Sequence, residues 1–478
     1  MSRVAGKAAV VMGGGLAGLA AAHTLARSGK QVAVLERADG LGGLSRTIVH
    51  RGFRFDIGGH RWFTKKDELN LFLHDLLGGE LIDIRRLSHI YFDGKYIEYP
   101  ISFSSVLRGV KPWMVARAGL DYLVSRALRG RRDGTAGTPS MRDAYVEQFG
   151  RTLYETFFEQ YSRKVWGHTC DELSGDWVAQ RSRGLTLSSI AKSTITGRNG
   201  RRETLADRFK YPRLGIGQIG EVMGDSIKVD GGEVLLDAGV CAVFHRQGIV
   251  ESVVYEWKGG LHEVEGSHII SSIPITDLVG LLCPPAPLDV LEAATRLSYR
   301  DLITVNVMLD RESVTNDTWI YMHDPDIVFG RLHEPTNWSP HMAPSGKTSL
   351  VAECFCSVGD EIWSASDDVL CEMTVDQLSN SLGFISRRDV LGAFVVRSRQ
   401  AYPTYLIGYD RALEKIKGYL TSLRNLQIVG RSGTFRYNNM DHSIETGMLA
   451  ARNILGEELD IEAVNREREY LEARMVAG

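Results

Sequence analysis

The segment that most constrains how this chain can fold is AAVVMGGGLAGLAAAHTLARSGKQVAVLE, at positions 8–36. Its apolar start, residues 8–12, predicts a short buried strand that runs directly into glycines. Gly13, Gly15 and Gly18 follow the G-x-G-x-x-G spacing. Such glycines allow a tight turn, a close approach of the backbone to a pyrophosphate, and close packing of helix on strand. The segment therefore predicts a dinucleotide-binding unit.

A helix and an acidic residue follow these glycines in the order that a nucleotide site requires. Residues 16–28 have a helix-forming composition, and the N–H groups at its start, near Leu16 and Ala17, would face the phosphates. A second strand, residues 31–35, ends at Glu36, which is placed to accept a hydrogen bond from a ribose hydroxyl. Arg37 follows and is expected to line the same site. This fingerprint alone is compatible with NAD as well as with FAD.

Composition narrows the class of protein. The chain has 478 residues, enough for two or more domains, and its net charge is −3. This charge, without a basic run containing aromatic residues, argues against nucleic-acid binding. No segment reaches the roughly 18 apolar residues of a membrane span, and consecutive glycines interrupt any signal peptide. Six scattered cysteines lack metal-ligand spacing, which predicts no metal site and a reducing, cytoplasmic location. Cys354 and Cys356 are expected to pack in a core.

The pattern along the chain predicts an α/β protein with a nucleotide-binding domain, an inserted helical domain and a second, antiparallel sheet. The nucleotide-binding domain is expected at residues 1–100, 206–280 and 401–478, the helical domain at 101–205 and the second sheet at 281–400. Helices are predicted at residues 67–77, 141–149, 151–165 and 173–180, and in the last twenty residues. Strands are predicted at residues 52–56, 234–240, 248–255, 268–273, 302–309, 349–356 and 426–429. Asp93-Gly94 predicts a hairpin turn within residues 84–99.

A basic stretch at residues 107–132 has two interpretations. It mixes bulky apolar residues with arginines, and it ends in a flexible polar loop. A basic amphipathic helix of this kind can contact an anionic membrane surface or a polyprenyl phosphate. A solvated helical face is the simpler interpretation and the one that we favour.

Three further glycine-bearing segments predict a large dinucleotide whose flavin end reaches a second loop. The first two contain Gly42, Gly43 and Leu44, and Gly58, Gly59 and His60. A late turn begins at Gly430 and Arg431 and leads into a helix, which Asp441 or Ser443 is expected to cap. The expected cofactor-binding residues around that helix start are Asn439, Met440, Asp441 and Ser443. Together with the first glycines, these segments favour FAD over NAD.

Five motifs are similar to those of a known family. They are LGG at 41–43, GGH at 58–60, YSRKVWG at 161–167, AYP at 401–403 and GRSGTFRYNNMD at 430–441. From Val10 to about Gly456 the sequence resembles the flavin-dependent amine oxidase/protoporphyrinogen oxidase superfamily, and within it UDP-galactopyranose mutase and its relatives. The resemblance implies a Rossmann-like FAD-binding domain of the GR2 type, holding FAD non-covalently. It also implies a small-molecule nucleotide-sugar substrate, and it is compatible with a homodimer.

In the mutases, reduced FAD is the nucleophile that expels the diphosphate from a nucleotide sugar, and the sugar recloses with a different ring size. NAD(P)H or another donor would reduce the flavin. By this resemblance, His60 lies beside the flavin ring and Arg431 sits on the flavin. Tyr161 and Trp166 would line the nucleotide pocket.

The resemblance also assigns the groups that bind the diphosphate. Arg331 would pair with it, and Tyr402 and Tyr437 would donate hydrogen bonds to its oxygens. Arg436, next to Tyr437, is expected to bind substrate. Fixed cationic and phenolic donors suit a departing diphosphate on chemical grounds as well.

The sequence departs from the mutase pattern at two places. Asn439 stands where the mutases carry an acid, and a neutral side chain cannot replace the electrostatic effect of a carboxylate. A second phosphate-binding arginine is not clearly aligned, and Arg181 or Arg183 would take its place. These departures weaken galactopyranose as the substrate more than they weaken a nucleotide-linked or phosphate-linked sugar.

Each site residue also has a purely structural interpretation. His60 could cap a turn, Trp166 could belong to a core, and Arg331 could be a buried arginine with an anionic partner. Tyr402 and Tyr437 could be structural phenols.

Three functional classes therefore stay open. We favour a mutase or isomerase. The alternatives are a FAD-dependent oxidase or dehydrogenase acting on a sugar, an amine or another small molecule, and a flavin-bearing protein without turnover.

Overall fold

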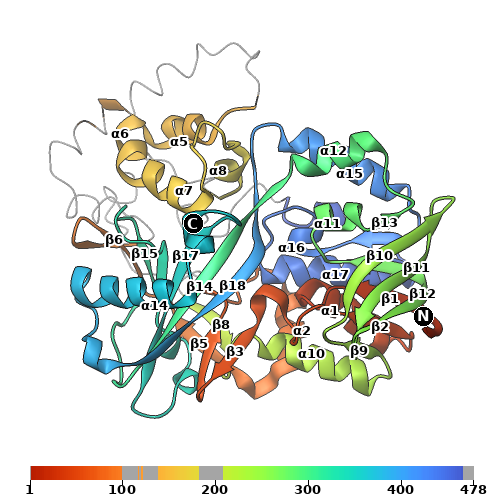
Figure 1. Ribbon diagram of the computed structural model, residues 1–478, viewed down its shortest axis with the longest axis horizontal. Helices are drawn as coiled ribbons and strands as arrows, with labels where there is room; N and C mark the ends of the chain where they lie inside the picture. The colour runs from red at the N-terminus through yellow and green to blue at the C-terminus, as the bar shows by residue number, and fades with distance from the viewer. Residues whose placement is uncertain (1, 100–116, 118–119, 122–137, 182–207, 467–478) are drawn as a thin grey trace.

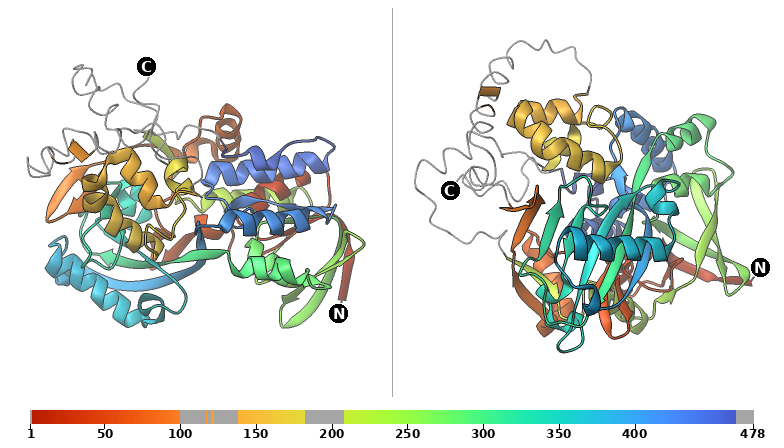
Figure 2. Two further views of the ribbon diagram at one scale, coloured as in Figure 1. Left: turned by 90° about the horizontal axis from the view of Figure 1, so that it is seen from above. Right: turned by 60° about the vertical axis from the view of Figure 1, so that its left-hand side comes forward.

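A computed structural model describes residues 2–99, 117, 120–121, 138–181 and 208–466 (Figure 1). The chain forms an eight-stranded sheet, a seven-stranded sheet and a group of helices that lies next to the second sheet. Figure 2 shows the same division from two other directions. The predicted fold class is confirmed: an α/β protein with a Rossmann-like sheet, a second sheet and inserted helices. The predicted basic stretch at residues 107–132 lies almost entirely outside the described residues.

The eight-stranded sheet contains the dinucleotide fingerprint. Its strands, in spatial order, are β13 (Leu282–Cys283), β10 (Gly239–Arg246), β11 (Ile249–Trp257), β12 (Gly260–Ser271), β1 (Ser2–Met12), β2 (Val32–Leu35) and β9 (Glu233–Leu235), and β19 (Leu426–Ile428) also pairs with β12. β1 lies parallel to both β2 and β12, with Met12 opposite Leu35 and Ser271. The strand predicted at residues 268–273 therefore does join this sheet.

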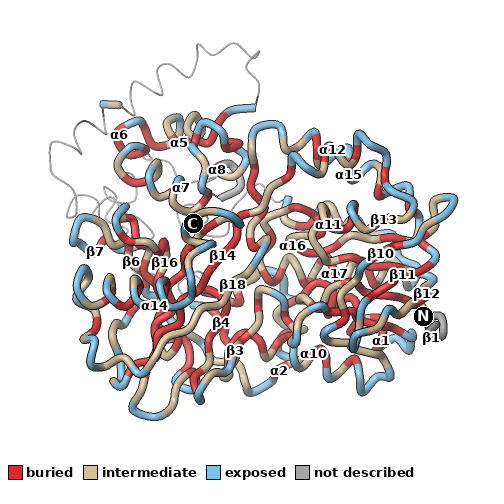
Figure 3. The backbone as a smooth tube through the Cα atoms, in the orientation of Figure 1, coloured by how far each residue is buried: buried red, intermediate tan, exposed pale blue. Residues whose placement is uncertain are grey.

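Helices cover this sheet because their apolar faces pack against its apolar surface. α1 (Leu16–Arg27) is rich in alanine and leucine, is buried along most of its length, and packs against α10 (Gln218–Val229) and α17 (Met440–Ile454). In Figure 3 the buried residues lie along α1 and along the strands of both sheets.

The strand predicted at residues 234–240 is wrong in one respect, because it is divided between β9 and β10. Asp237 breaks it, with a φ of +53° and an N–H that donates to the Ala38 carbonyl at 3.1 Å.

The seven-stranded sheet is antiparallel except where β15 and β6 run parallel. Its strands, in spatial order, are β18 (Val390–Thr404), β14 (Ser298–Leu309), β17 (Thr348–Cys356), β16 (Arg331–His333), β15 (Trp319–Met322), β6 (Ser88–Phe92) and β7 (Lys95–Glu98). Cys354 and Cys356 are buried in its core as free thiols, as predicted. The Asp93-Gly94 hairpin is also confirmed. The hairpin belongs to this sheet, however, so the predicted boundary at residue 100 separates β6 and β7 from their partners.

The described part of the inserted domain is helical. It consists of α5 (Met141–Phe149), α6 (Arg151–Leu153), a π-helical turn (Tyr154–Phe158), α7 (Glu159–Trp166) and α8 (Asp176–Arg181). α8 begins later than predicted, because Leu173 instead forms a bridge with Leu406.

Two cations fasten α7 to the second sheet. Lys164 Nζ donates to the carbonyls of Met322 and Ile327 at 3.0 and 2.8 Å. Arg300 Nε, from β14, donates to the Val165 carbonyl at 2.9 Å. The position of α7 relative to the sheet is therefore set by side chains from both elements.

The charged helix predicted for the last twenty residues lies mostly outside the described residues. Its described part contains only a 3₁₀ turn, Ile461–Ala463, and residues 467–478 lie outside the described residues. No helix within the described ranges combines the length and the apolar character that crossing a membrane requires.

Candidate active site

The turn between β1 and α1 shows why its glycines differ in role. Gly13 has a φ of +101°, and a Cβ atom there would stand 2.4 Å from Ser272 Oγ. A Cβ at Gly18 would stand 2.1 Å from the Gly13 carbonyl oxygen. Gly15, in contrast, faces open space, with no atom within 4 Å of its hypothetical Cβ. The protein's own packing therefore explains Gly13 and Gly18, whereas the space beside Gly15 suits a ligand that approaches the backbone.

The N-terminus of α1 is open to an anion. Gly15 is its N-cap residue, no side chain caps it, and its first turn, which includes Leu16 and Ala17, contains no acidic residue. The N–H groups of a first helical turn have no partner within the helix and favour negative charge. The loop with Gly42, Gly43 and Leu44 lies against this turn: the Gly42 N–H donates to the Gly14 carbonyl at 2.8 Å.

Glu36 lies at the end of β2, next to the same turn. Its carboxylate accepts hydrogen bonds from the N–H groups of Gly14 at 2.6 Å and Ala38 at 2.8 Å. These bonds fix the buried carboxylate beside the phosphate-binding turn, which is where a nucleotide ribose is expected. Arg37 is exposed.

The late turn at Gly430 reaches the first turn from the other end of the chain. A Cβ at Gly430, whose φ is +77°, would stand 2.8 Å from the Ala17 Cβ. Asn439 is the N-cap of α17, so neither Asp441 nor Ser443 caps this helix as predicted.

Asp441 and Ser443 lie within the first turns of α17 instead. Ser443 Oγ donates back to the Asn439 carbonyl at 2.9 Å, and Asp441 follows Met440, the first helical residue. Asp441 is 4% exposed, and its Oδ1 has no hydrogen-bond partner among the described residues. An orphaned carboxylate oxygen beside the two turns fits a hydroxyl-bearing dinucleotide.

A buried ion pair dominates the second part of the site. Arg331 on β16 faces Glu353 on β17; its Nε donates to Glu353 Oε1 at 2.7 Å and its Nη2 to Oε2. The Gly59 N–H also donates to Glu353 Oε1, at 3.1 Å. Burial would raise the pKa of Glu353, but the charge of Arg331 and the hydrogen bonds from His333 and Arg331 together outweigh burial, and the pKa falls to about 2. The anionic partner of Arg331 within the protein is therefore Glu353.

Glu353 was not identified from the sequence. A signal was present, because Glu353 is a single charged residue inside the apolar strand VAECFC. Side chains alternate along a strand, so Glu353 points away from the core face that contains Cys354 and Cys356.

His60 lies directly beside this ion pair. Its Nδ1 is 3.1 Å from the Gly58 carbonyl oxygen. Because a carbonyl only accepts, Nδ1 carries the proton of the neutral ring, which leaves Nε2 as an acceptor. Burial and the nearby Arg431 lower the pKa of His60 to about 4. His60 is therefore neutral at pH 7.

Arg431 lies over two stacked tyrosines. The ring centroids of Tyr402 and Tyr437 are 5.7 Å apart at an interplanar angle of 14°, and the Arg431 guanidinium is 5.3 and 4.8 Å from them. Its Nε donates to the Asn438 carbonyl at 2.8 Å. Burial raises the pKa of Tyr402 to about 12, so this phenol stays a hydrogen-bond donor. The structure thus brings together the four residues that the sequence predicted as catalytic, His60, Arg331, Tyr402 and Tyr437.

Two aromatic residues of α7 lie at the edge of this cluster. Tyr161 stacks on His323, with ring centroids 4.1 Å apart, and burial raises its pKa well above the usual range. Trp166 is 6% exposed and belongs to the core of the helical domain. Trp177, which no sequence motif indicated, packs between Trp166 and Tyr437, with ring centroids 5.0 and 4.9 Å away.

The other predicted substrate-binding residues are Arg436, Arg181 and Arg183. Arg436 points to the last described residues, where it bonds Glu462 and Val464. Arg181 is the last residue of α8, and Arg183 lies outside the described residues. Within the described ranges, no group of three or more His, Cys, Asp or Glu side chains could hold a metal ion.

Comparison with known proteins gives a family match and several similar folds. Residues 16–455 match the profile of the family described as flavin containing amine oxidoreductase. The fold is similar to that of reduced UDP-galactopyranose mutase, with a TM-score of 0.81, 21% identity, and coverage of 97% of this chain and 98% of that chain. It is also similar to a putative protoporphyrinogen oxidase from Exiguobacterium sp. 255-15, with a TM-score of 0.69, 17% identity, and coverage of 95% and 100%.

Similarity to curated proteins is confined to a short stretch. All-trans-retinol 13,14-reductase of Danio rerio is 52% identical over 52 residues, which is 11% of this chain and 9% of that protein. The match thus spans less than a tenth of that relative's length.

Proposed function

The chain belongs to the family of flavin-containing amine oxidoreductases, and from this premise we propose that it is a FAD-dependent mutase or isomerase of a nucleotide-linked or phosphate-linked sugar. The α1 N-terminus would hold the pyrophosphate of the flavin dinucleotide, and Glu36 would bind its adenosine ribose. The orphaned Asp441 oxygen would accept a hydroxyl near the flavin end. When bound, a reduced flavin supplies a nucleophile, and an oxidised flavin supplies a hydride acceptor.

One observation supports an anionic substrate above all. The described side chains of the cluster around Arg331 hold two guanidinium groups, those of Arg331 and Arg431, against the single carboxylate of Glu353. His60 is neutral there, and Tyr402 stays protonated. The cluster therefore has a net positive charge with phenol donors beside it, which suits a phosphate or diphosphate better than a cationic amine.

This chemistry assigns a task to each of the protein's groups. Arg431, Tyr402 and Tyr437 would stabilise the negative charge that develops on a departing diphosphate. Glu353 would orient Arg331 through two parallel hydrogen bonds, so that the guanidinium needs no reorganisation during the reaction. The likeness in fold to reduced UDP-galactopyranose mutase supports the proposal, and the neutral Asn439 leaves the identity of the sugar open.

The proposal is tested with the purified flavoprotein. Oxidised and dithionite-reduced forms are incubated separately with UDP-hexoses and other nucleotide hexoses, and products are separated by chromatography. We expect an isomeric product from the reduced form only, without net oxidation of the flavin. Flavin bleaching by the substrate, with hydrogen peroxide released in air, would instead identify an oxidase and contradict the proposal.

A pair of variants tests the residue assignment. Tyr437→Phe and Tyr402→Phe each remove one hydroxyl and should weaken UDP binding by about tenfold while flavin content stays unchanged, because one hydrogen bond to a charged group contributes about 1.5–3 kcal/mol. Unchanged UDP affinity in both variants would show that these phenols do not contact the diphosphate. The cytoplasmic location and the homodimer stay predictions.

A further inference from the structure

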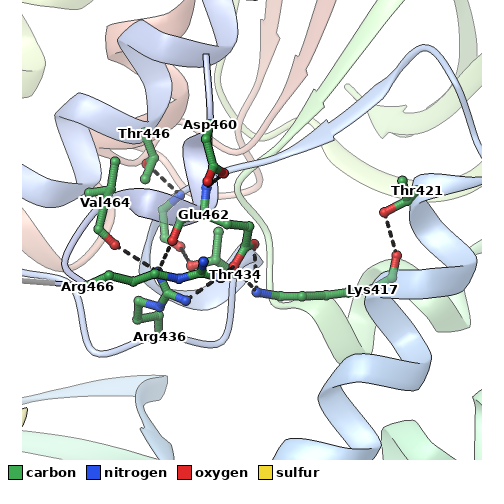
Figure 4. A network of polar contacts seen from close by, with 10 residues as sticks. Lys417, Thr421, Thr434, Arg436, Thr446, Asp460, Glu462, Val464 and Arg466 are labelled. Atoms are coloured by element: carbon green, nitrogen blue, oxygen red, sulfur yellow. Dashed lines mark hydrogen bonds and ion pairs between the residues drawn. The ribbon is translucent and has the colours of Figure 1, made fainter. Parts of the chain in front are cut away.

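The last described residues, 459–466, form a segment that we call the C-terminal strap (Figure 4). Glu462 is its main anchor. Its carboxylate accepts hydrogen bonds from Lys417 Nζ at 2.7 and 2.9 Å and from Arg436 Nη2 at 3.2 Å. Arg466 lies 3.7 Å from the same carboxylate. The strap is therefore fastened both to α15 (Tyr409–Thr421), through Lys417, and to the turn that contains Arg436.

Arg436 also binds the backbone of the strap. Its Nη1 donates to the carbonyl oxygens of Glu462 and Val464, both at 2.8 Å. Val464 is 4% exposed, so the backbone of the strap is held firmly at this point. Although Arg436 directly precedes Tyr437 in the sequence, its side chain serves the strap.

Asn465 extends these contacts to Tyr437 itself. Its Nδ2 donates to the Tyr437 carbonyl at 3.1 Å and to Asn438 Oδ1 at 3.1 Å. Asn438 in turn accepts from Arg431 Nε through its carbonyl, at 2.8 Å. Asn465 adopts a φ of +59°, a conformation that asparagine tolerates better than most residues. The strap thus reaches the backbone of both Tyr437 and the residue that holds Arg431.

The turn that the strap holds is strained. Phe435, a bulky buried residue, has a φ of +50°. The Asn438 N–H donates to the Arg436 carbonyl at 2.7 Å, and the Tyr437 N–H donates to the Tyr405 hydroxyl at 2.8 Å. A bulky residue in this region persists only where its surroundings over-determine the conformation. Contacts from the strap, Tyr405 and Arg431 together supply that constraint.

We propose that the C-terminal strap belongs to the machinery of the site, with Asn465 and Glu462 as positioning residues that aim the Tyr437 phenol and, through Asn438, the Arg431 guanidinium. The inference rests on the proposed function only in taking Tyr437 and Arg431 as groups that face a phosphate-bearing ligand. Neither Asn465 nor Glu462 needs to touch that ligand.

Asn465→Gly is the sharpest test, because glycine keeps the positive φ and removes only the amide. Glu462→Gln is a second variant with the same shape and no charge. Glu457→Gln is the matched control: it removes an exposed pair with Arg452, at 2.6 Å, that lies just before the strap. Each full-length flavoprotein is titrated with UDP by calorimetry, and amide hydrogen exchange is followed over residues 434–440.

We expect Asn465→Gly and Glu462→Gln to weaken UDP binding by about tenfold and to accelerate exchange over residues 434–440, whereas the control changes neither. In a Tyr437→Phe background, Asn465→Gly should weaken UDP binding clearly less than it does in the wild type, because one of the two groups that it positions is absent and only Arg431 remains. An equal loss in both backgrounds, or unchanged exchange and affinity, would overturn the proposal.

Failure of the proposed function has a different signature. If the wild-type protein does not bind UDP, the proposed function fails, and the strap is then judged on the visible flavin spectrum. Asn465→Gly should shift that spectrum in the same direction as Tyr437→Phe. If Tyr437→Phe shifts the flavin spectrum and Asn465→Gly does not, Asn465 does not position Tyr437.

Discussion

Gly447 on α17 lies so close to Ala17 on α1 that a Cβ atom at Gly447 would stand 2.0 Å from the Ala17 carbonyl oxygen. This contact joins two segments that are 430 residues apart in the sequence. It also sets the late turn at Gly430 against the first glycine-rich turn, since Gly430 contacts the same alanine. The nucleotide site therefore depends on how closely these two helices pack.

Gly447→Ala should separate α1 from α17 and destabilise the protein by about 3 kcal/mol, because the obstructing atom is backbone and cannot rotate away. Gly418→Ala is the matched control. Gly418 lies in α15, where a Cβ meets no atom within 4 Å, so alanine should stabilise by about 0.5–1 kcal/mol. Urea unfolding measures both. Equal effects at the two positions would contradict the close approach.

Gly15→Ala and Gly18→Ala should separate ligand binding from folding. Gly15 faces open space, so its alanine variant should keep the stability of the apoprotein within about 1 kcal/mol and weaken FAD binding by at least about tenfold. Gly18→Ala instead forces a Cβ against the Gly13 carbonyl and should destabilise the fold by about 2–3 kcal/mol. Thermal unfolding of the apoprotein and reconstitution with FAD distinguish the two. Full FAD affinity in Gly15→Ala would exclude a phosphate at this turn.

Glu353→Gln should leave the Arg331 guanidinium without its counter-charge. The Glu353 side chain is fully buried and that of Arg331 is 21% exposed, so we expect a loss of about 2–4 kcal/mol in the free energy of unfolding. Glu457→Gln, at an exposed pair, should change stability by less than about 1 kcal/mol. Adding Arg331→Met to Glu353→Gln should recover part of the loss, because the guanidinium that has lost its counter-charge is then removed as well. If the double variant is less stable than the single one, the ion pair is not the cause.

His323 should make stability depend on pH below neutrality. Burial, and then Lys164, lowers its pKa from 6.5 to about 3, so the unfolded chain binds a proton that the folded chain excludes. This contribution is fully present above pH 6.5 and is lost as the pH falls toward 3, with a total on the order of 5 kcal/mol. His323→Phe keeps a ring beside Tyr161 and removes the titration. Its stability should therefore decline less than that of the wild type between pH 7 and 4.5, and parallel curves would contradict the assignment.

Local features of the fold could be predicted from sequence because neighbouring residues determine them. The glycine turn at Gly13, the start of α1 and the Asp93-Gly94 hairpin all depend on backbone conformations that a few adjacent residues impose. The position of Glu36 followed from the same spacing. Predictions that depended on where a side chain points were less secure. The sequence led us to expect Arg436 at the substrate, and the structure shows its side chain bonded to the strap, while Asn439 caps α17 in place of Asp441 or Ser443.

The sequence by itself determined that a dinucleotide-binding turn lies near the N-terminus and that a second glycine-bearing turn comes late in the chain. Each turn is specified by glycines that lie only a few residues apart. Only the tertiary structure decided which side chains meet. Arg331 and Glu353 are opposed by the register of β16 and β17, and Asn465 reaches Tyr437 across a strained turn. Such contacts depend on strand pairing and helix packing between distant segments, and no local pattern encodes them.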